Sequence, residues 1–359
     1  MSQRPVVREP KKIMVRSANW VGDAVMSIPA LEALRKRFPE AEIVMVVKPW
    51  VSELYWYHPA INRQIVYDAD GKHRGRHGFR ELLKNLRGER FDMAILFQNA
   101  FHAAWMAWRA EIPRRIGFAR GGRSGLLTDA VLPPPRAAYR HQAYDYIQLL
   151  FRAGLIAASD PVSSWEEPML KLTDAERTWA ERQLKALGLG GRRYLIGIHP
   201  GASFGPAKRW LPERFAALAD RLVGALGADV LIFGSADEKP LAEQIAEAMR
   251  HSPLVVAGQT SLRQMMALFG QCCLAITNDS GPMHVAAGLG LPLVAIFGST
   301  DERSTGPLSP RARVVKARVE CSPCGLRVCP VDFRCMRGVT AEDAHRVALE
   351  LLREAHVTP

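Results

Sequence analysis

Short apolar runs alternate with amphipathic stretches along the whole chain. The apolar runs predict buried strands, and the stretches in which apolar residues recur every three or four positions predict helices. In the first half the predicted strands are Lys12–Ser17, Glu42–Val47, Gln64–Tyr67 and Phe91–Gln98. The predicted helices between and after them are Ala24–Phe38, Phe79–Arg87, Ala100–Arg109 and Tyr139–Ala153. This alternation favours an α/β fold with a doubly wound parallel sheet.

The same alternation begins again after Ala157–Pro168, a polar stretch with several prolines that is the best candidate for a linker. Its predicted strands include Tyr194–His199, Asp229–Phe233 and Leu254–Val256, and its predicted helices include Thr173–Leu187, Pro212–Leu226, Glu238–Met249 and Leu262–Phe269. We therefore expect two domains, residues 1–165 and 166–340, and a C-terminal helix within 341–359 that packs back on the first domain. A cleft between two such domains is a preferred site for small molecules.

The stretch Leu274–Gly298 has the most informative pattern: a strand, a polar corner, a helix of small residues and a second strand. In the corner, Asp279 or Ser280 can cap the helix, and Pro282 suits its first turn. Gly281 lets a ligand approach the backbone closely. The free N–H groups of that helix start, with the helix dipole, form an anion site. An ordinary strand–helix corner has the same local pattern, so a functional interpretation depends on the rest of the chain.

Two further polar loops follow predicted strands, where ligands bind in open α/β sheets. The first is Ala18–Asp23, in which Asp23 is either a helix N-cap or a functional carboxylate. The second is the Gly-rich basic loop His199–Trp210, which contains Lys208 and Arg209. Backbone N–H groups and a lysine ammonium in such a loop suit a diphosphate, and an ordinary surface loop is the alternative.

Charge narrows the choice of partner. The 359 residues carry a formal net charge of +12, which favours an acidic partner such as a nucleic acid, an anionic membrane or a phosphorylated substrate. The basic stretches Lys72–Arg90 and Arg109–Arg123 are either solvated surfaces or phosphate-binding surfaces. Few aromatic residues lie among these cations and no nucleic-acid-binding motif occurs, which disfavours DNA and RNA. With neither a signal peptide nor an apolar run of roughly 18–20 residues, we expect a cytoplasmic protein that meets membranes only peripherally.

Several catalytic motifs are missing from the sequence. No GxxxxGK[ST], GxGxxG, HExxH or GxSxG occurs, which weakens the NTPase, dehydrogenase, zinc protease and α/β-hydrolase interpretations. Four late cysteines, Cys321, Cys324, Cys329 and Cys335, are separated by two, four and five residues. In a cytosolic protein such a cluster is more often metal-binding or reduced than disulfide-bonded. A structural zinc and free thiols both remain open, because the spacing contains only one CxxC pair.

Four segments together carry a family resemblance: NWVGDAVMSIPALEALRKRFPEAEI, HPGASFGPAKRW, LIFGSADE and TNDSGPMHVAAGLGLPLVAIFG. They resemble, in the same order and from about residue 12 to 300, the bacterial ADP-heptose:lipopolysaccharide heptosyltransferases. The similarity is strongest to the heptosyltransferase II branch. It implies a GT-B fold of two Rossmann-like domains facing a cleft. The first domain would bind a phosphorylated lipid A inner-core acceptor (heptosyl-Kdo2-lipid A), and the second ADP-L-glycero-D-manno-heptose.

The resemblance also implies roles for individual residues. The catalytic carboxylate is Asp23, which would take the acceptor's proton in a single inverting displacement at the cytoplasmic face of the inner membrane. Lys208 and the N–H groups of the Ser280–Gly281 turn would stabilise the leaving ADP without a metal ion. The residues implied in donor binding are Ser203, Lys208, Glu238 (or its neighbour Asp237), Thr260, Asp279, Ser280, Gly281 and His284. Those implied in acceptor binding are Asn19, Trp20 and Arg120.

Two alternatives stay open at this point. One is another core heptosyltransferase, of the I or III type, or a related sugar-nucleotide transferase. The other is a basic nucleotide- or polyanion-binding protein that is not an enzyme.

Overall fold

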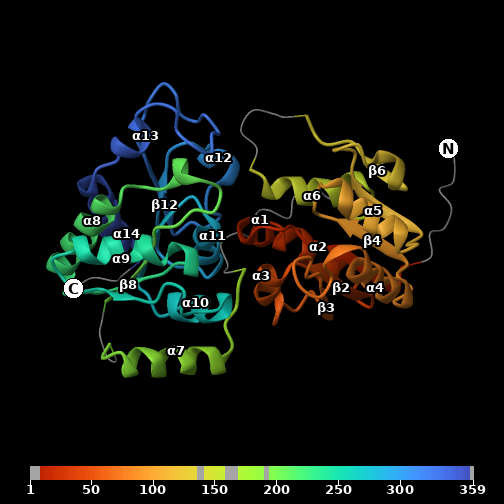
Figure 1. Cartoon of the computed structure of the whole chain (residues 1–359), viewed down its shortest axis with the longest axis horizontal. Coiled ribbons are helices and arrows are strands. Elements are labelled where there is room, and N and C mark those ends of the chain that lie inside the picture. Colours follow the sequence, from red (N-terminus) through yellow and green to blue (C-terminus); the bar gives the residue numbers. More distant parts are fainter. Residues whose placement is uncertain (1–8, 136–140, 158–168, 190–193, 356–359) are drawn as a thin grey trace. The chain divides into compact units, whose positions relative to one another are not determined.

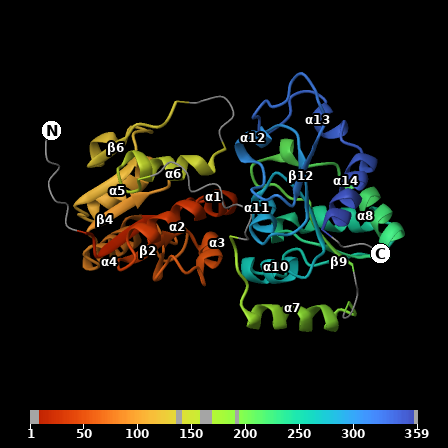
Figure 2. The ribbon, with the colours of Figure 1, turned by 180° about the vertical axis from the view of Figure 1, so that it is seen from behind.

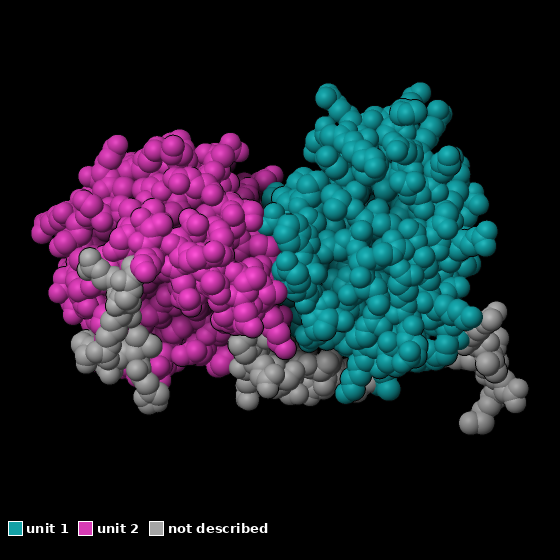
Figure 3. Space-filling view, turned by 90° about the horizontal axis from the view of Figure 1, so that it is seen from below, with its two compact units in different colours: residues 1–163 teal, residues 164–359 magenta. Residues whose placement is uncertain are grey.

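The computed structural model describes residues 9–135, 141–157, 169–189 and 194–355, and the chain divides into two compact units. Unit 1 comprises residues 1–163 and unit 2 residues 164–359 (Figure 3). The expected boundary at 165/166 and most of the expected linker lie outside the described residues.

Unit 1 is built on a six-stranded parallel sheet with the order β3-β2-β1-β4-β5-β6 (Figure 1). Its strands are β1 (Lys12–Arg16), β2 (Glu42–Val47), β3 (Arg63–Val66), β4 (Met93–Leu96), β5 (Arg114–Phe118) and β6 (Asp129–Val131). The central strands β1, β2 and β4 are buried at almost every position. That is the pattern of parallel strands covered on both faces, which explains why their apolar runs are continuous.

The helices of unit 1 cover both faces of this sheet. They are α1 (Val21–Met26), α2 (Ile28–Arg37), α3 (Pro49–Ser52), α4 (Gly75–Gly88), α5 (Phe101–Arg109) and α6 (Ala143–Arg152). Side chains alternate between the faces of a strand, and Met14, Val46 and Leu96 point to the face that packs with α4 and α5. Helices α2 and α6 contact each other on the other face (Figures 1 and 2).

Two local features of unit 1 differ from expectation. The expected helix Ala24–Phe38 is two helices, α1 and α2, which meet at Ser27, where the Ser27 hydroxyl donates to the Ala24 carbonyl at 2.8 Å. Helix α1 begins at Val21 with Trp20 as its N-cap, so Asp23 is not the cap but the third helical residue. The basic stretch after Arg109, in which no strand was predicted, contains β5 and leads to β6.

Unit 2 has a second six-stranded parallel sheet, with the order β12-β11-β10-β7-β8-β9. Its strands are β7 (Leu195–His199), β8 (Asp229–Ile232), β9 (Leu254–Val255), β10 (Leu274–Asn278), β11 (Leu293–Phe297) and β12 (Ala312–Lys316). Counted from its first strand, each sheet has the same order: two strands follow on one side of the first strand and three on the other. The order reverses between β1 and β4 and between β7 and β10, and ligands of such folds bind outside the carboxyl ends of the strands at this switch point.

The helices of unit 2 are α7 (Asp174–Ala186), α8 (Pro212–Leu226), α9 (Lys239–Ala248), α10 (Leu262–Phe269), α11 (Gly281–Gly288), α12 (Glu302–Thr305), α13 (Arg334–Arg337) and α14 (Ala341–Glu354). Helix α14 contacts α8, β11 and β12 (Figure 1), and its Ala344, Ala348 and Leu351 belong to the core of unit 2. The apolar face of the C-terminal helix, which was expected to pack on the first domain, is thus part of the core of unit 2. No helix in the described ranges is long and apolar enough to cross a membrane.

Candidate active site

Asp23 lies at the switch point of unit 1, in the first turn of the helix that follows β1. The Gln142 side chain, at the start of α6, donates from Nε2 to Asp23 Oδ1 at 2.7 Å. Tyr146 is buried nearby, and its pKa is raised well above the ordinary value first by that burial and then by the negative charge of Asp23. The carboxylate is thus oriented by an amide and remains half-buried, which suits a group that must exchange a proton with a bound molecule.

Arg16, at the end of β1, holds the loop that carries Asp23 through hydrogen bonds. Arg16 is 2% exposed and donates to the carbonyls of Ser17 at 2.8 Å and Val46 at 3.1 Å, and to Asn19 Oδ1 at 2.8 Å. Burial lowers the pKa of Arg16 to about 10, so the buried group keeps its charge at neutral pH. Trp50 Nε1 donates to the Asn19 carbonyl at 2.7 Å. Sequence reasoning missed Arg16, although a cation at the end of an apolar strand was a usable signal.

Of the three expected acceptor residues, two lie in this loop. Asn19 is oriented by Arg16, and Trp20 caps α1 with its side chain 57% exposed. Arg120 lies elsewhere, in the loop after β5, with its guanidinium carbon 5.6 Å from the centre of the Phe118 ring. Among the described residues, no hydrogen bond or ion pair joins Arg120 to Asp23.

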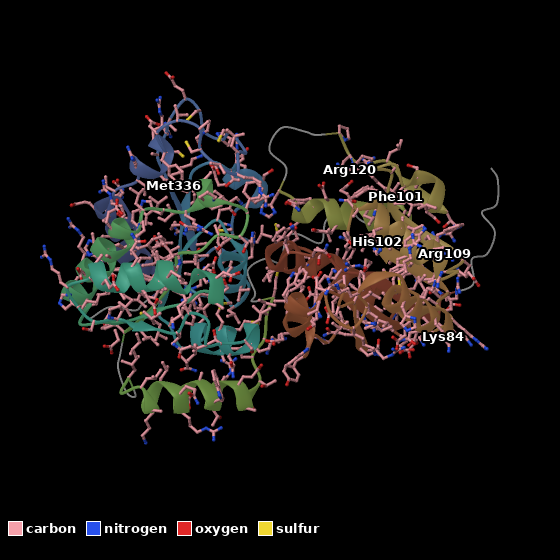
Figure 4. The ribbon with its side chains drawn as sticks, in the orientation of Figure 1. Lys84, Phe101, His102, Arg109, Arg120 and Met336 are labelled. Carbon is pink, nitrogen blue, oxygen red and sulfur yellow. The ribbon has the colours of Figure 1, made fainter. Side chains whose placement is uncertain are left out.

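The two basic stretches of unit 1 differ, because the second is mostly tied into the fold and the first is largely exposed. In the second, Arg114 pairs with Asp129 at 3.0 Å across β5 and β6, and the buried Arg123 donates to the Phe118 carbonyl at 3.0 Å. The first forms the outer face of α4, where Lys84 and its basic neighbours are exposed. Figure 4 labels Lys84, Arg109 and Arg120 in unit 1, and Arg87 of α4 donates from Nε to the Arg109 carbonyl at 2.9 Å, so the two stretches meet there.

In unit 2, a buried ion pair lies at the switch point between β7 and β10. Lys208 Nζ is 2.5 Å from Asp279 Oδ2, and the two residues are 9% and 3% exposed. The Thr300 hydroxyl, just after β11, also donates to Asp279 Oδ2 at 2.5 Å. Lys208 comes from the loop after β7 and Asp279 from the corner after β10, so the ion pair joins the two loops that the sequence singled out. Ser203, in the first of these loops, is exposed.

At the ends of β7, β10 and β11 and in the loops after them, several buried polar atoms have no hydrogen-bond partner among the described residues. Ser280 is the N-cap of α11, but its hydroxyl makes no hydrogen bond within the described part of the chain. The Ser299 hydroxyl and His199 Nδ1 also lack a hydrogen-bond partner among the described residues. Buried polar atoms nearly always have a partner, so these atoms are candidates for hydrogen bonds to water or to a polar ligand. Gly281 opens α11 beside them, and His284 is buried in the same helix at 4% exposure.

A second buried carboxylate, Glu238, lies next to the loop after β7, which carries Lys208. Glu238 Oε2 accepts from Ser235 N at 2.9 Å and is 3.7 Å from His199 Nε2. Burial lowers the pKa of His199, although the charge of Glu238 opposes the shift. Glu238 can occupy this position only because residue 201 is a glycine: a Cβ there would lie 1.9 Å from Glu238 Oε1. Asp237 is exposed, so Glu238 is the acidic residue of this turn that faces the loop after β7.

Asn278, which the sequence analysis did not single out, holds both ends of the loop after β7. Its Nδ2 donates to the Pro200 carbonyl at 2.6 Å, and its Oδ1 accepts from Trp210 N at 3.0 Å. Thr260 is half-buried in the loop after β9. In that loop Gly258 N donates to the Gly234 carbonyl at 2.9 Å, which places the segment beside the turn that carries Glu238.

Metal binding finds little support in these residues. The chain contains an Asp-x-Asp sequence, Asp68-Ala69-Asp70, but Asp68 Oδ1 accepts from Gly71 N at 2.9 Å and thereby closes a turn. The described residues contain no group of three or more His, Cys, Asp or Glu side chains that could hold a metal ion. The six cysteines, Cys321, Cys324, Cys329 and Cys335 among them, are free thiols.

Two doubly wound units, each with polar side chains at its switch point, define the fold as the GT-B type that many glycosyltransferases share. Solved structures agree. One titled as the structure of Escherichia coli ADP-heptose lps heptosyltransferase II matches with a TM-score of 0.80 and 30% identity, covering 96% of this chain and 99% of that one. A glycosyl transferase family 9 structure from Veillonella parvula matches with a TM-score of 0.84 and 27% identity, covering 96% and 98%.

Sequence comparison identifies the family. The family model for glycosyltransferase family 9 (heptosyltransferase) matches residues 79–333. Lipopolysaccharide heptosyltransferase 2 of Escherichia coli is 34% identical over 316 residues, which cover 85% of this chain and 88% of the relative. The chain belongs to glycosyltransferase family 9, and it is an enzyme. This membership sets aside the alternative of a polyanion-binding protein without activity.

Proposed function

We propose that this enzyme transfers heptose from ADP-L-glycero-D-manno-heptose to the heptosyl-Kdo2-lipid A inner core in lipopolysaccharide biosynthesis. The names of the similar proteins support the reaction, and one observation on this chain carries it: the buried Lys208–Asp279 pair beside the start of α11. A cation and free helix N–H groups at one switch point form a diphosphate site.

On the donor side, unit 2 stabilises the leaving ADP. Negative charge develops on the diphosphate as the sugar bond breaks, and preorganised donors aimed at that charge lower the barrier. Lys208 and the N–H groups of Ser280 and Gly281 supply this stabilisation. Asp279 holds Lys208 in place and, in this proposal, also contacts the heptose, while His284 shapes the same helix start. Glu238, Ser203 and Thr260 border the ADP from the neighbouring loops.

On the acceptor side, Asp23 is the general base. It takes the proton of the attacking hydroxyl in a single displacement that inverts the anomeric centre, and help of this kind is worth roughly 10²–10⁴-fold in rate. Gln142 keeps the carboxylate oriented by its hydrogen bond to Oδ1. Asn19 and Trp20, in the same loop, contact the acceptor sugar. Arg120, in the loop after β5, also takes part in acceptor binding. No metal ion takes part in this scheme.

Substrate binding tests this proposal first. Calorimetric titration with ADP-heptose, UDP-sugars and GDP-sugars, each with and without EDTA, should show binding of the ADP-sugar alone and no effect of EDTA. Turnover is then measured with two acceptors, one that carries the first heptose and one that lacks it. Use of only the heptosylated acceptor supports the proposed step. Preference for the bare Kdo acceptor would assign the enzyme to the I type, and preference for another nucleotide sugar would overturn the reaction.

The acceptor is a lipid, so the proposal includes peripheral binding at the cytoplasmic face of the inner membrane. The exposed basic face of α4, with Arg76, Arg80 and Lys84, is the surface assigned to this contact. Binding to vesicles that contain anionic lipid should weaken at high salt, since exposed charges are screened over about 8 Å at physiological ionic strength. Changing all three residues to Gln should weaken it as well. Salt-resistant binding, or a triple variant that binds like wild type, would contradict this assignment.

A further inference from the structure

We propose that Arg327 is a positioning residue for donor binding, which holds the loop after β7 in the conformation that presents Lys208 to the diphosphate. The inference rests on the proposed function, because Lys208 is taken as the diphosphate ligand. Arg327 lies in the segment of residues 321–329, here called the cysteine segment, which runs between β12 and α13. The hydrogen bonds of this segment to the loop after β7 indicate its role.

The cysteine segment is anchored at the carboxyl end of β11. Ser322 Oγ donates to the Gly298 carbonyl at 2.6 Å, and Gly325 N donates to the Ser299 carbonyl, also at 2.6 Å. Met336, labelled in Figure 4, is fully buried and packs against Gly298, where a Cβ at position 298 would lie 2.9 Å from its sulfur. The segment is therefore fixed to the sheet at the strand next to the switch point.

From this anchor, Arg327 reaches the loop that carries Lys208 through both its backbone and its side chain. Its carbonyl accepts from Ala207 N at 3.0 Å, and its Nε donates to the Phe204 carbonyl at 2.7 Å. Gly205 lies between these two contacts, and a Cβ there would be 2.4 Å from the Arg327 carbonyl oxygen. The close approach of the two backbones thus depends on a glycine. Arg327 binds the loop on both sides of Gly205, at Phe204 and at Ala207.

The Phe204 ring connects Arg327 to Lys208. The guanidinium carbon of Arg327 is 5.3 Å from the ring centre, and Lys208 Nζ is 4.8 Å from the same centre. Both distances lie within the range of a cation–π contact. Because Arg327 fixes the Phe204 backbone and contacts its ring, it determines where the ring lies, and the ring lines the position of the Lys208 ammonium.

Three substitutions separate positioning from direct contact with the ligand. Arg327→Gln keeps an N–H donor at the bond position of Nε but removes the charge. Arg327→Lys keeps the charge but has a methylene at that position, and Arg327→Ala removes both. The matched control is Arg318→Ala, which removes an exposed arginine before the cysteine segment. The readout is calorimetric affinity for ADP and for adenosine, since only the former has phosphates for Lys208, together with the donor and acceptor KM values.

Positioning predicts that Arg327→Ala weakens ADP binding about tenfold, the combined worth of one hydrogen bond and one exposed cation–π contact. Adenosine affinity and acceptor KM should stay as in wild type, Arg327→Gln should lie closer to wild type than Arg327→Lys, and Arg318→Ala should be unchanged. Equal weakening of ADP and adenosine would show a general distortion and overturn the inference. Rescue by Lys but not Gln would replace positioning by direct charge contact, and unchanged ADP affinity in Arg327→Ala would refute it.

Failure of the proposed function gives a different result. Wild-type protein that binds neither ADP nor ADP-heptose would overturn that proposal and this inference with it. Wild-type binding of ADP that Lys208→Ala leaves intact would remove Lys208 as the ligand and so also remove the role of Arg327. Wild-type binding that depends on Lys208 but not on Arg327 would overturn this inference alone.

Discussion

The ion pair of Lys208 and Asp279 allows a quantitative test of the donor site. Both side chains are almost completely buried, and their charged atoms are 2.5 Å apart. Removing one partner of a buried pair leaves the other charge uncompensated, which typically costs about 3–5 kcal/mol. Lys208→Met and Asp279→Asn should therefore each destabilise unit 2 by about that amount. The double variant should lose less than the sum, because it leaves no orphan charge.

Scanning calorimetry measures this loss as a shift in the unfolding midpoint. Unit 2 spans residues 164–359, and for a domain of this size 1 kcal/mol corresponds to roughly 2–4 °C. Each single variant should unfold roughly 6–20 °C below wild type. The coupling between the two changes should reach about 2 kcal/mol, within the range for residues in direct contact.

Adding ADP extends this comparison of single and double variants to ligand binding. Asp279→Asn leaves a buried ammonium that the diphosphate can neutralise, so ADP should stabilise this variant strongly, whereas Lys208→Met should gain little from ADP. Ligand at about 100 times its Kd adds about 2.7 kcal/mol, which is large enough to resolve. Two results would refute the reasoning: stability losses that add to within about 0.5 kcal/mol, and equal stabilisation of both variants by ADP.

Three further changes test other parts of the site. Asp23→Asn keeps an oxygen for Gln142 but removes the base, so kcat should fall by roughly 10²–10⁴ with donor affinity unchanged; wild-type turnover would exclude Asp23 as the base. Burial lowers the pKa of His199, so below about pH 6.5 the unfolded chain takes up a proton that the folded chain resists, and stability falls with pH. His199→Gln should lose less stability than wild type between pH 7 and pH 5, as measured by urea unfolding, and equal losses would contradict this. Gly205→Ala places a Cβ 2.4 Å from the Arg327 carbonyl oxygen and should weaken ADP binding at least as much as Arg327→Ala; wild-type affinity would show that the close approach does not matter.

The sequence predicted the centre of each sheet better than its edges. Strand β2 and helix α8 have the bounds expected for them, because a buried strand is continuously apolar and an amphipathic helix has a clear period. Strands β5 and β6 were missed. Strand β5 begins with two arginines, and the first, Arg114, is neutralised by Asp129 on β6. That pairing exists only once the two strands are adjacent, so no local pattern reports it.

The loops of the candidate site were found from the sequence, but not the contacts that hold them. Strand ends with Gly, Ser and Asp pointed to the loops of Asp23, Lys208 and Asp279, because the position of a ligand site in this fold follows from strand order. The roles of Asn278 and Arg327 depend on partners far away in the chain. Arg327 lies 123 residues from Phe204, whose carbonyl it binds. A single sequence contains no signal for a contact of that kind.

The two units have the same strand order, yet their switch points carry opposite chemistry, and the donor site suggests why. Asp279 shows what happens to a carboxylate beside Lys208: it forms an ion pair at 2.5 Å and accepts a second hydrogen bond from Thr300. In this arrangement, Asp279 Oδ2 is occupied by the Lys208 ammonium and the Thr300 hydroxyl. Asp23 belongs to the other unit, where it accepts from an amide and adjoins a buried phenol. In the proposed mechanism the base, Asp23, belongs to unit 1 and the diphosphate ligand, Lys208, belongs to unit 2, where its ammonium pairs with Asp279.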